Sequence, residues 1–212
     1  MKHRKKKHPP AAGITFVFPT VSVCTLALWL ALEPDGATLL TLLAAALHEL
    51  GHIVAARLLG IGITRITLLP LGADIRFSRV TSYREDIITG GAGAAVNLLS
   101  ALLLLPLSYN PAVRYFICSS LALCAVNMLP IASLDGGTVL RGLLSDRLPP
   151  KTSGIILGAV SAACLTSLWL CSVYLMLSRC VGVELWAISL SVMLGFLSEQ
   201  DAGDNNRPNN KY

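Results

Sequence analysis

Long apolar runs, separated by short polar or charged stretches, dominate the pattern of this chain. A helix needs about 20 predominantly apolar residues to cross a bilayer, and repeated runs near that length favour spanning helices over buried ones. The sequence predicts an all-α polytopic membrane protein with about six transmembrane helices. They are expected at Ile14–Leu32, Thr38–Leu59, Ile87–Leu107, Pro111–Pro130, Ser153–Leu177 and Val183–Leu197.

Composition supports the membrane interpretation. Hydrophobic residues make up 54% of the 212 residues and charged residues only 14%, whereas a soluble domain carries about 25% charged residues. The first run, Ile14–Leu32, follows a basic segment as a signal peptide would. It is longer than the roughly 7–15 residues of a signal-peptide core, and acidic Glu33-Pro34-Asp35-Gly36 follows it without a cleavage site. We therefore expect a retained helix.

Lysine and arginine are distributed unevenly between the two sides of this six-helix arrangement. With Met1–His8 in the cytoplasm, 15 of the 17 Lys and Arg residues fall on the cytoplasmic side, and only Arg114 and Arg179 fall outside. This bias is what the positive-inside rule requires. We expect a multi-pass protein of the cell membrane with both termini cytoplasmic. Topology and attraction to anionic lipid explain the basic tail, so the lipid bilayer is an expected partner and nucleic acid is not.

The segments outside the apolar runs also carry a pattern. Ile61–Leu68 and Ala73–Phe77 alternate apolar and polar residues around Pro70 and Gly72, which predicts a short membrane-associated β-ribbon between helices 2 and 3. Such an edge can pair with an extended peptide. The predicted organisation is a basic cytoplasmic tail over residues 1–13, a membrane domain over 14–198 and a disordered polar tail over 199–212.

Polar residues with catalytic potential interrupt the second apolar run, at His48-Glu49-Leu50-Gly51-His52. Positions i and i+4 share one face of a helix, so His48 and His52 can bind the same metal ion, and Glu49 can act as a general base. This is the H-E-x-x-H pattern of zinc hydrolases. Because charged residues are costly at the centre of a spanning helix, a functional cluster is favoured over polar packing. The expected cofactor is Zn²⁺.

A catalytic zinc site needs a third protein ligand, and carboxylates are the remaining candidates. Most acidic residues lie in solvated stretches or on the other side of the membrane: Asp35, Asp74, Glu85, Asp86, Asp146 and Glu184. Asp135 instead follows an apolar run that contains Asn127, and Gly136 and Gly137 after it permit close approach of the backbone. The alternative for this Asp-Gly-Gly is a surface turn. Asp135 is the preferred third ligand.

The His48-Glu49-Leu50-Gly51-His52 motif, followed by Asn127-x-x-Pro130-x-x-x-x-Asp135-Gly136, resembles the intramembrane zinc metalloproteases called site-2 proteases. The resemblance implies that His48, His52 and Asp135 bind zinc. It implies that Glu49 is the general base and that Asn127 holds the substrate or its oxyanion. The substrate would be a membrane-associated protein, such as a membrane-tethered pro-sigma or anti-sigma factor.

Within that family the sporulation branch, typified by stage IV sporulation protein FB, is the most similar. The helix before the His-Glu motif, the ribbon and two helices after Asp135 are typical of it. That branch often has a C-terminal CBS domain, which we do not expect here, so ATP-linked control through such a domain is not carried over. Gly93-Ala94-Ala95-Val96-Asn97 looks like the family's Gly-Pro-x-x-Asn element, with Ala94 in place of proline. No role is therefore carried over to Asn97, because packing of small residues between helices explains this stretch.

Two other function classes stay open. A zinc-binding membrane transporter would use His48, His52 and Asp135 as ligands, but it would give Glu49 no purpose. A non-catalytic membrane scaffold would be expected to have lost a ligand or the base, and none is missing. Peptide-bond hydrolysis by a zinc metalloendopeptidase is the preferred function.

Overall fold

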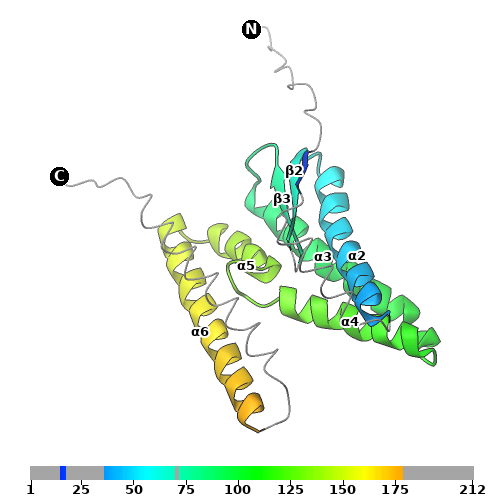
Figure 1. The fold of residues 1–212 in the computed structure, drawn as a ribbon. Coiled ribbons are helices and arrows are strands. Elements are labelled where there is room, and N and C mark those ends of the chain that lie inside the picture. The colour runs from blue at the N-terminus through cyan, green and yellow to red at the C-terminus, as the bar shows by residue number, and fades with distance from the viewer. Residues whose placement is uncertain (1–14, 18–35, 70–71, 179–212) are drawn as a thin grey trace, which may run out of the picture. The chain divides into compact units, whose positions relative to one another are not determined.

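The computed structural model describes residues 15–17, 36–69 and 72–178 (Figure 1). These residues form two compact units, one reaching Val126 and the other starting at Asn127. In chain order the elements are β1 (Thr15–Val17), α2 (Ala37–Leu58), β2 (Ile63–Leu69), β3 (Gly72–Phe77), α3 (Tyr83–Leu104), the 3₁₀ helix η1 (Leu105–Leu107), α4 (Pro111–Asn127), α5 (Asp135–Ser145) and α6 (Pro150–Leu177).

Three helices of the described part are long and apolar enough to cross a membrane: α2, α3 with η1, and α6. They confirm the helices expected at Thr38–Leu59, Ile87–Leu107 and Ser153–Leu177. The run expected at Pro111–Pro130 forms α4, a shorter apolar helix of 17 residues that ends before Pro130. The run Val183–Leu197 and the polar tail lie outside the described residues.

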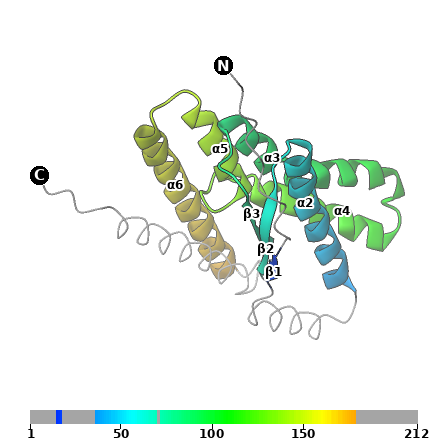
Figure 2. The ribbon, with the colours of Figure 1, turned by 90° about the horizontal axis from the view of Figure 1, so that it is seen from above.

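The start of the first predicted span is wrong, and the fold is not purely helical. Thr15–Val17 forms β1, which pairs in parallel with Arg65–Thr67 of β2. Figure 2 shows β1 beside β2. These residues have the β-branched and aromatic side chains that fit a pleated strand, and pairing with a preformed edge satisfies their backbone groups. The rest of the run to Leu32 lies outside the described residues.

The predicted ribbon is confirmed, and β1 extends it to a three-stranded sheet in the order β1-β2-β3. Strands β2 and β3 pair antiparallel, from Ile63 opposite Phe77 to Leu69 opposite Gly72. Gly60, with a φ of 67°, turns the chain from α2 into β2. Ala56, Ile61, Ile63 and Ile66 form a buried cluster that ties the ribbon to the end of α2.

Helices α2 and α3 pack closely because small residues face each other. A Cβ on Gly51 of α2 would lie 2.8 Å from the carbonyl oxygen of Ala92 and 3.0 Å from the Cα of Gly93. Small residues let backbones approach in this way in membrane helix pairs. A capping box fixes the start of α3, since the Ser82 hydroxyl accepts from the Glu85 amide and the Glu85 carboxylate accepts from the Ser82 amide.

The second unit contains a helix that the sequence did not predict. Residues 131–152 lie between two of the predicted spans, yet Asp135–Ser145 forms α5, which packs against α6. Ile131 and Leu165 are buried at the centre of a small apolar cluster in this unit. A connector of this length can therefore fold back on α6 and bury its own apolar residues.

Candidate metal centre

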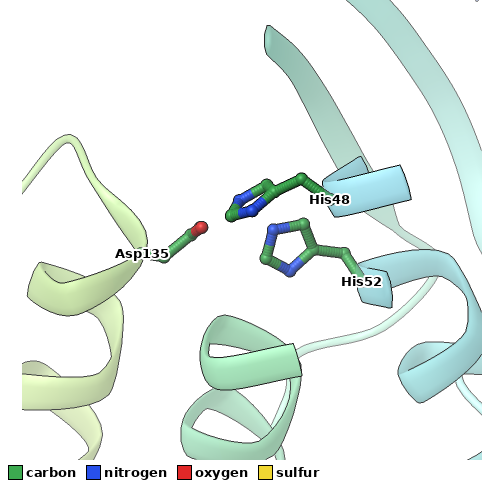
Figure 3. A group of neighbouring side chains, drawn as sticks. All are labelled: His48, His52 and Asp135. Atoms are coloured by element: carbon green, nitrogen blue, oxygen red, sulfur yellow. The ribbon is translucent and has the colours of Figure 1, made fainter. Parts of the chain in front are cut away.

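His48 and His52 lie on successive turns of α2 and are almost fully buried, with 4% and 9% of their surfaces exposed. Their ring centroids are 4.9 Å apart and the rings are nearly perpendicular, at 77°. Their ligand nitrogens lie within 4.8 Å of each other. Figure 3 shows both rings projecting from the same side of α2. The predicted i, i+4 geometry is therefore confirmed for the two histidines.

The ring of His52 is held by the backbone of α3. Its Nδ1 lies 2.7 Å from the carbonyl oxygen of Thr89. A carbonyl oxygen can only accept a hydrogen bond, so Nδ1 carries the proton and donates it. The neutral ring then keeps its lone pair on Nε2, the form in which histidine binds a metal ion. This backbone contact fixes both the orientation and the tautomer of His52.

His48 contacts a residue for which sequence reasoning gave no role. Its Nδ1 lies 3.3 Å from the Nδ2 of Asn97, a residue of α3 with no exposed surface. The Oδ1 of the same amide is buried without a hydrogen-bond partner. Thr89, Gly93 and Asn97 recur every four residues and therefore share one face of α3. The sequence therefore places these three residues on one face of α3, but the spacing alone does not show that this face lies against the histidines.

Gly93 occupies the middle of that face, directly opposite the two imidazoles. A Cβ built there would lie 2.5 Å from Nε2 of His52 and 2.7 Å from Nε2 of His48. Both Nε2 atoms therefore face the same small volume over Gly93, while both Nδ1 atoms are engaged by α3. The sequence assigned Gly93 only a packing role, but its missing side chain makes room for the Nε2 ends of both rings.

Glu49 follows His48 directly on α2 and is half-buried. One residue rotates a helical position by about 100°, so Glu49 projects beside the histidine face rather than along it. This placement leaves the ligand positions to the histidines and puts a carboxylate next to them. It is what a general base beside a metal site requires.

Asp135 belongs to the second unit, where it is the first residue of α5 and is half-buried. Its loop is held tightly by the two following glycines. A Cβ on Gly136 would collide with the carbonyl oxygens of Met128 and Leu129, and a Cβ on Gly137 with that of Ile131. The Asp-Gly-Gly sequence is thus a packed helix start and not the exposed turn that was its alternative interpretation.

Ser161 of α6 forms hydrogen bonds with the same loop. Its buried hydroxyl accepts from the amide of Ala132 at 2.9 Å, and it lies within hydrogen-bond distance of the carbonyl oxygens of Leu157 and Pro130. The position of Asp135 in its unit is therefore set by backbone contacts around the glycines and by one serine. Sequence patterns gave no sign of this role for Ser161.

Asn127, the predicted oxyanion donor, is the last residue of α4 and is half-buried. It precedes the loop that carries Met128 and Leu129 to the glycines. Asn127 is therefore the residue directly before the loop that connects α4 to Asp135.

The chemistry of the donor set fits zinc. His48, His52 and Asp135 each offer one ligand atom, two imidazole nitrogens and one carboxylate oxygen (Figure 3). Two histidines and one carboxylate form a known catalytic zinc set, and the fourth position stays open in such sites. The space over Gly93, where any side chain would meet both Nε2 atoms, also suits an ion held between the rings.

Residues 37–112 match the model of peptidase family M50. The match spans α2, the ribbon and α3, so it includes His48, Glu49, His52 and Asn97 and ends before Asn127 and Asp135. It confirms the resemblance to site-2 proteases that the motifs indicated. Thr89 and Asn97, which contact the two histidines, also lie within the matched segment.

The proteins similar to this chain include two curated proteins and a solved structure. A zinc metalloprotease of Methanocaldococcus jannaschii is 31% identical over 117 residues, which cover 51% of this chain and 34% of that protein. Stage IV sporulation protein FB of Bacillus subtilis is 32% identical over 120 residues, which cover 53% of this chain and 42% of that protein. This chain thus matches less than half the length of either relative.

The structure of a site-2 protease from Methanocaldococcus jannaschii has a TM-score of 0.67 to this chain at 24% sequence identity. The similarity covers 88% of this chain and 91% of the other. The fold of this chain is therefore similar to that of the solved site-2 protease.

Proposed function

We propose that this chain is an intramembrane zinc metalloendopeptidase of the site-2 protease type, which cleaves membrane-associated proteins. One observation carries the proposal. Two buried histidines of an apolar helix direct their Nε2 atoms over Gly93 while α3 engages both Nδ1 atoms, and Glu49 lies beside them. Buried polar groups in an apolar helix are costly, and a metal-dependent hydrolase gives His48, His52 and Glu49 each a role.

The zinc ligands and Glu49 have different roles in the proposed reaction. A zinc ion, when bound, polarises a carbonyl group and lowers the pKa of a water molecule to about 7. His48 and His52 supply neutral imidazole ligands, and Asp135 supplies the third ligand. Glu49 accepts the proton of the attacking water at its carboxylate and later gives it to the leaving amine.

Asn127 is proposed to bind the substrate carbonyl through its side-chain amide. One such donor at a developing oxyanion is worth about 2.7–4 kcal/mol in other hydrolases. Its place at the end of α4, before the loop to Asp135, supports this role. The substrate segment has to be unwound, because a helical backbone keeps its carbonyl groups hydrogen-bonded and shielded.

The proposed setting is a six-helix membrane domain over residues 14–198 with both termini in the cytoplasm. Three long apolar helices and the excess of Lys and Arg on one side support it. Reporters fused after Thr81 and after Asp146 are expected to read as cytoplasmic, and a reporter near Asp35 as external. An external signal after Thr81 would contradict this topology.

The proposed substrate class is a membrane-tethered regulator, such as a pro-sigma or anti-sigma factor. Similarity to stage IV sporulation protein FB supports a function in sporulation or in related regulated proteolysis. Co-expression of the chain with candidate membrane-tethered regulators would identify the substrate by the appearance of a shorter product.

Glu49→Gln is the experiment that tests the chemistry. Glutamine is nearly isosteric with glutamate but cannot accept the proton at neutral pH. The variant should retain zinc and lose about 10²–10⁴-fold in cleavage rate. Asp146→Asn, which neutralises an exposed carboxylate at the end of α5, is the matched control and should cut normally.

Each alternative function predicts a different result for Glu49→Gln. A transporter would keep zinc passage, and a scaffold would show no change of any kind. Zinc binding together with cleavage at the native rate would refute the proposed mechanism.

The ligands are tested by zinc content. Purified protein should hold one zinc per chain, and His48→Ala or His52→Ala should greatly reduce it. Asp135→Ala should weaken binding less, because two imidazoles remain. Full occupancy in the His48→Ala/His52→Ala double variant would place the zinc elsewhere.

A further inference from the structure

Asn97 is fully buried on α3, yet only half of its amide is used in the structure. Its Nδ2 lies 3.3 Å from Nδ1 of His48, and its Oδ1 has no hydrogen-bond partner. A buried polar atom without a partner costs about 1–3 kcal/mol, so such atoms call for an explanation. Rotation of the amide by half a turn exchanges the two atoms, which have nearly the same size and shape.

The chemistry of His48 decides which of the two amide atoms should face it. Nε2 of His48 points into the space over Gly93, so Nε2 is the atom available to a metal ion. A neutral imidazole that binds through Nε2 carries its proton on Nδ1 and donates it to an acceptor. An amide NH₂ in front of a protonated Nδ1 would place two donors against each other, whereas Oδ1 accepts that proton.

We infer that Asn97 is a positioning residue for His48: with zinc bound, its Oδ1 accepts the Nδ1 proton and thereby fixes the ring and its tautomer. This inference rests on the proposed function only in that His48 is a zinc ligand. With this contact, α3 supports both histidines. The Thr89 carbonyl holds His52, and the Asn97 amide holds His48, two turns further along the same face.

The asymmetry between these two supports makes the inference testable. The acceptor for His52 is a backbone atom that no substitution removes, whereas the acceptor for His48 is a side chain. Substitution at position 97 therefore perturbs one ligand and leaves the other in place. Loss of a residue that supports a metal ligand typically costs 10–100-fold in metal affinity.

The experiment compares zinc affinity by chelator competition for the full-length native chain, Asn97→Leu and Asn97→Asp. Leucine has a similar volume but no acceptor, so affinity should fall 10–100-fold. Aspartate offers a carboxylate oxygen to Nδ1, so affinity should stay within a few-fold of native. Ser120→Ala is the matched control, because its hydroxyl is equally buried and also without a partner, but it lies on α4 rather than on the helix that supports the histidines.

A spectroscopic measurement on the native chain keeps the inference falsifiable if Asn97→Leu fails to fold. In ¹⁵N-histidine spectra of the zinc-loaded protein, both ligand rings should carry the proton on Nδ1 and bind through Nε2. Coordination of His48 through Nδ1 would overturn the inference, and so would native zinc affinity in Asn97→Leu.

The proposed ligand set and the role of Asn97 can fail separately. Unchanged zinc content in His48→Ala would refute the ligand set itself. Loss of zinc in His48→Ala, combined with native affinity in Asn97→Leu, would refute only the role of Asn97.

Discussion

A single methyl group at position 93 should abolish the metal site. In Gly93→Ala the new Cβ would lie 2.5 Å from Nε2 of His52 and 2.7 Å from Nε2 of His48. Ordinary van der Waals contact begins at about 3.4 Å, so the rings must retreat by about 0.9 Å and 0.7 Å if α3 keeps its place. Gly91 on the same helix has no atom within 4 Å of the position that a Cβ would take. Gly91→Ala is therefore the matched control.

The required displacement is large compared with the tolerance of a zinc site. Zinc–nitrogen bonds are about 2.0–2.1 Å long, and credible ligand distances vary by about 0.2 Å. A shift of about 0.9 Å is several times that tolerance. Rigid packing also prevents an easy retreat, because the Thr89 carbonyl and Asn97 engage the far sides of the rings.

The two alanine variants should therefore differ in stability as well as in zinc binding. Overpacking a well-packed core costs about 1–3 kcal/mol, so Gly93→Ala should unfold more easily despite the better helix propensity of alanine. Gly91→Ala gains that propensity, up to about 1 kcal/mol, without a collision. It should be at least as stable as the native chain.

The assay is zinc content and chelator competition for both variants in detergent, with thermal unfolding measured on the same samples. We expect Gly93→Ala to lose at least 10–100-fold in zinc affinity and all measurable cleavage, and Gly91→Ala to behave as native. Native zinc affinity in a folded Gly93→Ala protein would refute the idea that the rings meet over this glycine.

Other changes test the elements that carry the site. Gly137→Ala should destabilise the second unit, since its Cβ would collide with the Ile131 carbonyl, whereas Gly154→Ala, with open space around it, should be neutral in thermal unfolding. Ser161→Ala should cost about 1–3 kcal/mol of stability and weaken zinc binding by displacing the Asp135 loop, because it removes the acceptor of a backbone amide. Native stability in Ser161→Ala would contradict a role of the Ser161 hydroxyl in holding this loop. Ser82→Ala should lower stability by about 0.5–2 kcal/mol through loss of the α3 cap, and full recovery by Ser82→Asp would confirm capping as the cause.

Elements defined by local pattern could be read from the sequence. Helix α2 and the alternating strands β2 and β3 lie close to their predicted bounds. The paired histidines were also predictable, because the spacing i, i+4 fixes their relation on any helix. In each case the information lies within a few neighbouring residues.

Features that depend on distant contacts could not be read in this way. The strand β1 exists because Thr15–Val17 meets an edge of β2 that lies about 50 residues further along the chain. Helix α5 is short, and much of its stability comes from packing on α6 rather than from its own sequence. No role was assigned to Asn97 because Ala94, three residues before it, stands where the family element has a proline. Only the packing of α3 against α2 reveals its contact with His48.

The α2–α3 interface explains why the site needs so few polar residues. Gly51 lets α3 approach until its backbone lies against α2, and Gly93, whose Cα faces Gly51, leaves room for both rings. That same closeness brings a backbone carbonyl and one amide within hydrogen-bond distance of the rings. A larger residue at either glycine would separate the helices, and the imidazoles would lose both their space and their partners together. Small residues that pack membrane helices therefore also build the metal site, so helix packing and metal binding should fail together in any substitution that widens this interface.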